Sequence, residues 1–98
     1  MNITKDRNEN KLIVAVEGKI DSITAPEFEE FLRDNIDGVT ELTIDLASLD
    51  YISSAGLRVL LLTQKRMNTQ GTMEVINVNE TVSEIFEVTG FSDILTIR

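Results

Sequence analysis

The sequence predicts an α/β protein with a mostly parallel central sheet of about five strands, the first two of which are antiparallel. Two observations lead to this fold class. Short apolar segments with strand periodicity alternate with longer segments of helical periodicity, in the order β-β-α-β-α-β-α-β. The few breakers fall between these segments. The length of 98 residues and a hydrophobic content of 42% suit one compact domain over residues 1–98.

The expected strands are short and mostly apolar. The first is expected to pair with the second across the polar turn KDRNENK. The second, KLIVAVEG, is apolar at consecutive positions, which predicts a strand with both faces largely buried. The third, ELTIDLASL, places Leu42, Ile44 and Leu46 on one face. In chain order, the expected strands are residues 2–4, 11–18, 41–49, 72–77 and 94–98.

Three helices are expected between these strands, over residues 24–36, 54–71 and 79–90. The first begins at Thr24, and Glu27 follows at the spacing of a capping box. The second is apolar almost all round in its middle, which predicts a helix packed deeply against the sheet, and Gly71 is its expected stop. The third has Asn79 as its candidate cap and ends at Gly90.

The composition excludes several classes of function. The chain has 17 acidic and 9 basic residues, and its net charge of −8 argues against nucleic-acid and anionic membrane partners. The charge favours a basic patch on a protein partner, or serves only solubility. Without cysteine or histidine, no disulfide, thiolate nucleophile or imidazole metal ligand is available. We therefore expect a protein that is not an enzyme and holds no metal or cofactor. Because no apolar run is long enough to span a bilayer and MNITKDRNEN lacks an apolar signal core, we expect it in the cytoplasm.

The segment DYISSAGLRVL places two serines directly before the second helix. With Ser53 as the N-cap, its hydroxyl accepts a hydrogen bond from the backbone N–H of Ala55 or Gly56. Ser54 then becomes the first helical residue, and its side chain is free to face outward between small neighbours. A phosphate there would lie at the positive end of the helix and add about −1.5 to −2 charge to the surface. The alternative is that both serines only cap the helix.

Two aspartates are further candidates. In open sheets of this kind, functional residues gather where strands end and helices begin, and Asp21 follows the second strand at the edge that also carries Ser54. It either binds a partner there or serves only as a turn or cap carboxylate. Asp45 lies within the third strand, where it faces a polar helix end or pairs near an edge.

Three segments of the chain resemble a known family. VEGKIDSITAPEFEEFL, LTIDLASLDYISSAGLRVLL and MEVINVNETVSEIFEVTGFSDIL are similar to the STAS domain, specifically to the bacterial anti-sigma factor antagonists. The similarity runs from about Leu12 to Ile97, and its most specific part is the block DLASLDYISSAGLRVL. The fold of that family has the element order expected above.

The resemblance implies a partner-switching role. The unphosphorylated protein would bind an anti-sigma factor that is itself a serine kinase, and so free the sigma factor. The kinase, which supplies ATP and magnesium, would phosphorylate the serine two positions before the glycine of the block, here Ser54. A phosphatase would reset the switch.

The resemblance also implies site residues. Ser54 is the expected phosphorylation site, with Ser53 as the alternative acceptor, because Ser53 stands where many members have aspartate. The expected partner-binding residues are Asp21, Ser22, Thr24, Ser53, Ala55, Gly56 and Arg58. The alternative function is an unphosphorylated STAS scaffold in a signalling, transport or lipid-trafficking complex.

Overall fold

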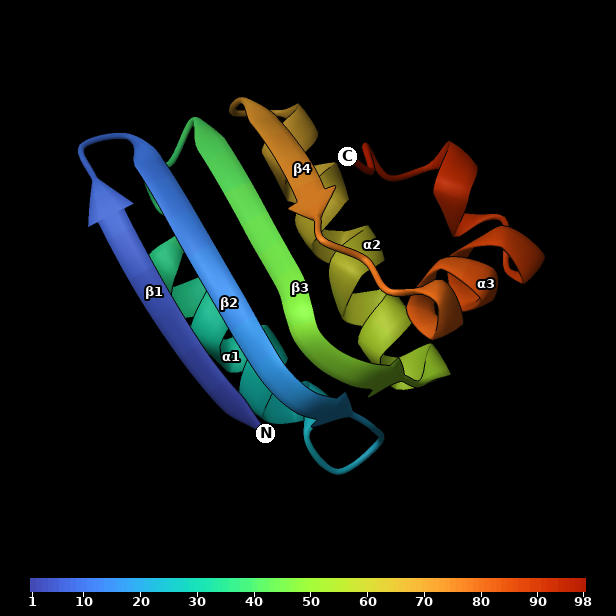
Figure 1. The fold of residues 1–98 in the computed structure, drawn as a ribbon. Helices are drawn as coiled ribbons and strands as arrows, with labels where there is room; N and C mark the ends of the chain where they lie inside the picture. The colour runs from blue at the N-terminus through green and yellow to red at the C-terminus, as the bar shows by residue number, and fades with distance from the viewer.

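The computed structural model describes all 98 residues and contains one four-stranded sheet with the strand order β1-β2-β3-β4. The first pair is antiparallel, and β2–β3 and β3–β4 are parallel, which confirms the predicted fold class (Figure 1). The strands are β1 (Asn2–Asn8), β2 (Lys11–Ile20), β3 (Glu41–Ile52) and β4 (Thr72–Ile76). The helices are α1 (Ala25–Asn35), α2 (Ser54–Asn68), α3 (Glu80–Val88) and the short 3-10 helix η1 (Phe91–Asp93).

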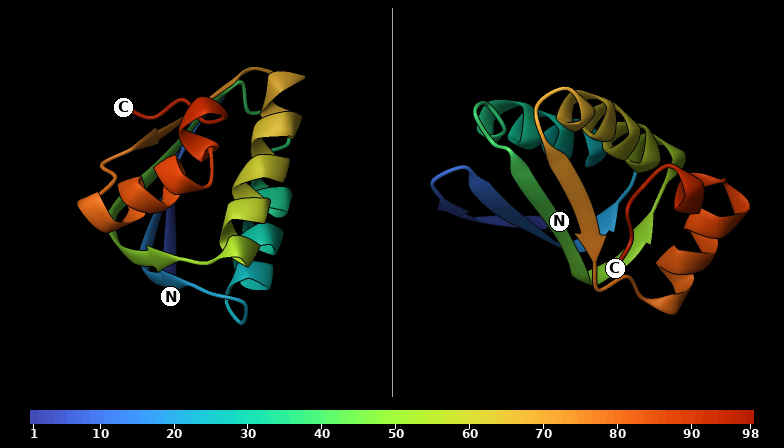
Figure 2. Two further views of the ribbon diagram at one scale, coloured as in Figure 1. Left: turned by 90° about the vertical axis from the view of Figure 1, so that its right-hand side faces the viewer. Right: turned by 90° about the horizontal axis from the view of Figure 1, so that it is seen from above.

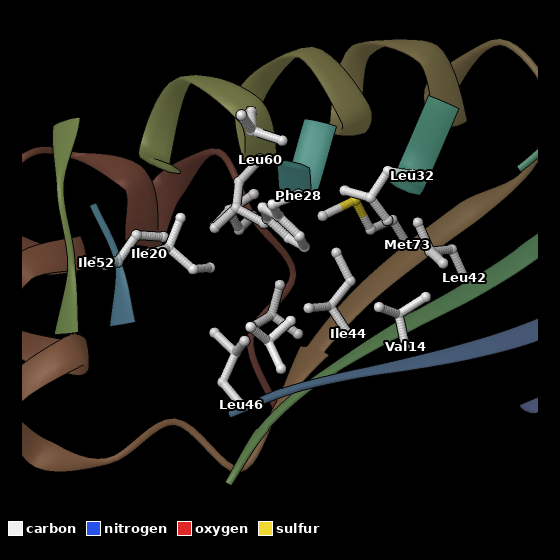
Figure 3. Close-up of a cluster of buried hydrophobic side chains, with 14 of the residues drawn as sticks. Val14, Ile20, Phe28, Leu32, Leu42, Ile44, Leu46, Ile52, Leu60 and Met73 are labelled. Atoms are coloured by element: carbon white, nitrogen blue, oxygen red, sulfur yellow. The ribbon is translucent and has the colours of Figure 1, made fainter. Parts of the chain in front are cut away.

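The core lies between the sheet and two helices. Figures 1 and 2 show α1 and α2 side by side along one face of the sheet, while α3 lies beyond the β4 edge. Phe28 and Leu32 of α1 and Leu60 of α2 face Val14 and Ile44 of the sheet, and all five are at most 1% exposed (Figure 3). Burial of each such side chain contributes about 1.5–3 kcal/mol to folding.

The expectation that β2 is buried on both faces is wrong. Leu12, Val14 and Val16 are at most 1% exposed, whereas Ile13 on the opposite face is 45% exposed. Because α1 and α2 cover the same face, no helix shields Ile13 from solvent (Figure 2). The protein therefore has two layers, the sheet and the helices α1 and α2, and the other face of the sheet is open to solvent.

The expected fifth strand is reduced to a single bridge. Ile97 forms one parallel bridge with Val75, in which the N–H of Val75 donates to the carbonyl of Thr96 at 2.8 Å and the N–H of Arg98 donates to Val75 at 2.9 Å. The preceding residues form η1, and Leu95 is buried in the core. Within residues 94–98, only Ile97 pairs with β4, so this segment forms an isolated bridge and no strand.

The ends of the second and third helices agree with the sequence. Gly71 follows the end of α2, where its N–H donates to the carbonyl of Met67 at 2.7 Å, and a Cβ there would collide with the carbonyl of Thr40. Gly90 follows α3 with φ of 80°, a conformation that glycine adopts without strain. None of the helices is both long and apolar enough to cross a bilayer.

Candidate functional site

The ends of β2 and β3 bring two of the predicted site segments together. Ile20 and Ile52 are register partners at the carboxyl ends of these parallel strands, and the N–H of Ser53 donates to the carbonyl of Ile20 at 2.8 Å. The loop 21–24 and the start of α2 therefore lie at the same edge of the sheet (Figure 1). Asp21 and Ser54 share this edge, as the sequence predicted.

Ser53 is the N-cap of α2. Its backbone is extended, with φ of −87° and ψ of 173°, and its hydroxyl accepts a hydrogen bond from the N–H of Gly56 at 3.3 Å. Its carbonyl accepts the first helical bond from Leu57 at 2.9 Å. Of the two donors considered from the sequence, Gly56 is the one that the cap engages. The predicted cap is confirmed.

Ser54 is the first residue of α2, and its hydroxyl makes no hydrogen bond within the protein. The side chain is exposed, in contrast to the partly buried Ser53. The first N–H groups of a helix have no helical partners, and they carry the positive end of the helix dipole. An anionic group attached to Ser54 would therefore lie where a helix favours negative charge.

Gly56 is buried, and its role is one of packing. A Cβ at this position would lie 2.6 Å from Cγ2 of Ile20 and 2.7 Å from Cγ1 of Ile52. Real Cβ atoms do not approach so closely, so the first turn of α2 can rest on the ends of β2 and β3 only with glycine. Gly56 therefore contributes no side chain to the surface, although it was predicted among the partner-binding residues.

The loop 21–24 is held by its own side chains. Oδ1 of Asp21 accepts hydrogen bonds from the N–H groups of Ile23 and Thr24, both at 2.9 Å. Oγ1 of Thr24 accepts from the N–H of Asp21 at 2.9 Å and donates to the carbonyl of Lys19 at 3.0 Å. The segment is thus an aspartate turn that leads into α1.

The predicted capping box at Thr24 and Glu27 is wrong. Thr24 has a helical backbone, with φ of −90° and ψ of −19°, and its side chain makes no cap hydrogen bond. The hydroxyl is instead taken by residues that precede the helix. The backbone of α1 is connected to the turn through the N–H of Ala25, which donates to the carbonyl of Asp21 at 2.9 Å.

The Asp21 carboxyl has a lowered pKa. Hydrogen bonds from the backbone N–H groups of Thr24 and then of Ile23 lower the pKa of Asp21 below its ordinary value, because they stabilise the ionised form. Asp21 is thus a turn carboxylate that also places a negative charge beside the start of α2.

Ser22 and Arg58 flank a shallow pocket between the first turns of α1 and α2. Both side chains are exposed, and the pocket has a volume of about 190 Å³. Arg58 makes no ion pair or hydrogen bond, whereas each of the four other arginines makes at least one. The lining residues are Ser22, Ala25, Pro26, Glu29, Ala55, Arg58 and Val59. Three predicted partner-binding residues therefore share one concave surface.

The other polar residues considered from the sequence lie elsewhere. Oδ1 of Asp45 accepts hydrogen bonds from the N–H of Ala47 at 2.9 Å and from Nδ2 of Asn77 at 3.1 Å, at the carboxyl end of β4, where Asp45 is the register partner of Ile76. Asn79 caps α3 as predicted, since its Oδ1 accepts from the N–H of Val82 at 2.8 Å. No group of three or more aspartates or glutamates is placed to hold a metal ion.

One exposed apolar residue at this edge was missed. Ile23 is 84% exposed, and it lies in the loop between Asp21 and Thr24. The sequence offered no signal for it, because isoleucine is among the residues that are most often buried.

This chain matches one family model, and two of its relatives carry one kind of name. The family model for the STAS domain matches residues 2–98. A protein of Bordetella bronchiseptica, BtrV, whose name describes it as an anti-sigma factor antagonist, is 37% identical over 99% of this chain and 85% of its own length. The anti-sigma-B factor antagonist of Bacillus subtilis is 35% identical over 99% of this chain and 92% of its own.

A solved structure shows the same fold. The crystal structure of an anti-sigma factor antagonist from Mycobacterium paratuberculosis is similar with a TM-score of 0.89 and 23% identity, over 98% of this chain and 83% of that one. The matched family model, the two relatives and the shared fold agree, and the chain belongs to the STAS domain family.

Proposed function

We propose that this chain is an anti-sigma factor antagonist that is switched by phosphorylation. Unphosphorylated, it binds an anti-sigma factor that is also a serine kinase, and the sigma factor is released in the cytoplasm. The kinase phosphorylates Ser54 and binding ends, until a phosphatase removes the phosphate. The names of the two relatives described above support the antagonist role. The unbonded, exposed hydroxyl of Ser54 is the observation that supports the switch.

The position of Ser54 suits a switch that acts through charge. A phosphate adds about −1.5 to −2 charge at neutral pH. At the first position of α2 the dipole favours that charge by about 0.3–1 kcal/mol, so the fold tolerates the modification. A partner that buries the same edge must desolvate the phosphate or be repelled by it. Binding would therefore be lost while the folded domain persists.

Ser53 is the less favourable acceptor. Its hydroxyl already accepts the hydrogen bond from Gly56, and its side chain is partly buried. A kinase would have to draw this oxygen out of the cap before transfer, which costs about 1 kcal/mol of helix stability. Ser54 needs no such rearrangement.

The role of the chain in this scheme is binding. Transfer of a phosphoryl group needs ATP and magnesium, and both belong to the kinase. The chain supplies the acceptor hydroxyl, the small neighbours Ala55 and Gly56, and the surface formed by Ser22 and Arg58.

Phosphorylation by the cognate anti-sigma factor kinase with Mg-ATP, followed by mapping of the phosphate by mass spectrometry, tests this proposal. We expect phosphate on Ser54 in the wild type and in the Ser53→Ala variant, and none in Ser54→Ala. Phosphate on Ser53 alone would overturn the assignment. A protein that binds the same kinase but is never phosphorylated would be an unswitched scaffold instead.

Binding of the phosphate mimic Ser54→Asp gives a second test. This variant should bind the kinase more weakly, while its melting temperature stays within a few degrees of the wild type. A large loss of stability would show that Ser54 is structural.

A further inference from the structure

The side chain of Ile23 is the most exposed large apolar group on the chain, followed closely by Val88. Ile23 is 84% exposed and Val88 is 82% exposed, whereas the other exposed large apolar residues are 45% exposed. A single exposed apolar residue is ordinary on a protein surface. The place of Ile23 is not ordinary, because the loop that carries it protrudes from the sheet edge next to the start of α2 (Figure 1).

The protein holds Ile23 in one position. Its N–H donates to Oδ1 of Asp21 at 2.9 Å, and the same oxygen accepts the N–H of Thr24. Oγ1 of Thr24 connects the loop back to the carbonyl of Lys19. Asp21 and Thr24 thus fix the backbone on both sides of Ile23. Because the loop is already ordered, binding of the side chain by a partner costs little further conformational entropy.

Ile23 directly follows Ser22, which belongs to the surface proposed to bind the anti-sigma factor. The adjacent pocket of about 190 Å³ lies between the first turns of α1 and α2, and Ser22 of the loop and Ala55 of α2 are among its lining residues. Ser54 lies directly before Ala55. A partner that covers the Ser54 hydroxyl therefore reaches both a projecting apolar side chain and a concave surface beside it.

We propose that Ile23 is the apolar anchor with which this chain docks on its anti-sigma factor, and the inference rests on the proposed function. The partner would hold the isoleucine in an apolar pocket with a basic rim. The ionised Asp21 carboxylate below the Ile23 backbone and the net charge of −8 favour basic groups around that pocket. Buried apolar anchors near the centre of an interface commonly carry much of its binding energy.

Calorimetric titration of the unphosphorylated chain with the cognate anti-sigma factor kinase tests the anchor. Ile23→Ser should weaken binding at least about tenfold. Ile23→Val, which removes one methylene, should weaken it by about fourfold. Val88→Ser is the matched control, because Val88 is equally exposed but lies at the end of α3; it should bind like the wild type. All three variants should keep the wild-type melting temperature, since neither side chain is buried.

A photoreactive residue gives an independent measurement. p-Benzoylphenylalanine at position 23 should crosslink to the kinase, and at position 88 it should not. Wild-type affinity of Ile23→Ser, or no crosslink from position 23 in a complex that forms, would overturn the anchor.

The outcomes separate the anchor from the switch. If Ser54→Asp abolishes binding while Ile23→Ser does not weaken it, the proposed function stands and the anchor is wrong. If the wild type does not bind the kinase, both are overturned.

Discussion

Two strand-to-helix junctions lie at the same edge of this protein, and they treat their hydroxyl groups differently. At the junction of β2 with α1, Oγ1 of Thr24 is engaged by the N–H of Asp21 and the carbonyl of Lys19. At the junction of β3 with α2, Ser53 serves the helix and the neighbouring Ser54 makes no bond. Each junction also carries an exposed hydroxyl without a hydrogen bond, Ser22 in the loop and Ser54 in α2, but only Ser54 is the first residue of a helix. Whether a hydroxyl at the start of α2 is free to react therefore depends on whether it belongs to the N-cap residue or to the residue after it.

The two junctions also differ in packing. The α2 junction rests on buried side chains, since Gly56 leaves no room above Ile20 and Ile52. The α1 junction is an outward loop held by hydrogen bonds, and it exposes Ile23. One junction therefore depends on close contact, and the other depends on polar bonds within the loop. Substitutions that remove one kind of support at a time sharpen this difference.

The largest effect is expected from Gly56→Val. The new side chain must displace Ile20 and Ile52, which are at most 1% exposed, and overpacking of this kind costs about 1–3 kcal/mol. We expect a decrease in the free energy of unfolding at the upper end of that range, measured by urea denaturation. Ser54→Val, two residues earlier on the exposed surface, should stay within about 0.5 kcal/mol. Equal stability of the two variants would show that the junction is not tightly packed.

A smaller effect is expected from Ser53→Ala. Loss of the hydrogen bond from Gly56 should lower the free energy of unfolding by about 1 kcal/mol in the same assay. Ser53→Asp retains a good cap and should recover most of that loss. If Ser53→Ala is as stable as the wild type, the cap observed in the structure contributes nothing.

The α1 junction should respond to pH instead. Because the pKa of Asp21 is lowered in the folded state, its ionised form stabilises the fold at pH values above the ordinary pKa of about 3.9. This stabilisation is lost as the pH falls through the lower pKa of the folded protein. Asp21→Asn should therefore be less stable than the wild type at neutral pH, by a few degrees in melting temperature, and the difference should narrow in acid. A constant difference across this range would contradict the role of the Asp21 charge.

The smallest effect is expected from Ser54→Ala. No hydrogen bond is lost, and alanine is a better helix former than serine, so the free energy of unfolding should change by less than about 0.5 kcal/mol. The phosphorylation assay described above should nevertheless lose its product. A destabilisation as large as that of Ser53→Ala would remove the distinction between the two serines.

Local chemistry explains which parts of the site were predictable. The Ser53 cap and the free Ser54 follow from helix-start rules that involve only a few neighbouring residues, and Asn79 follows from the same rules. The Thr24 box failed because Asp21 and Lys19 offered its hydroxyl partners ahead of the helix. The spacing of Thr24 and Glu27 contains no information about that competition.

Parts of the fold depended on where helices pack. An apolar Ile13 fits a buried strand face as well as an open one, and only the placement of α1 and α2 on one side decides between them. The segment ending in Ile97 has strand-like composition, yet η1 and the burial of Leu95 leave it one bridge to Val75. The exposure of Ile23 is likewise a property of the folded loop.

The missing Cβ of Gly56 has a consequence for how a signal could leave this protein. Because the first turn of α2 is packed closely against Ile20 and Ile52, we expect that a group added at Ser54 does not displace the helix. The added group would then be recognised only by a molecule that contacts it directly. Distant surfaces of the chain would not change on phosphorylation. Every protein that distinguishes the two states would therefore have to bind the surface around Ser54.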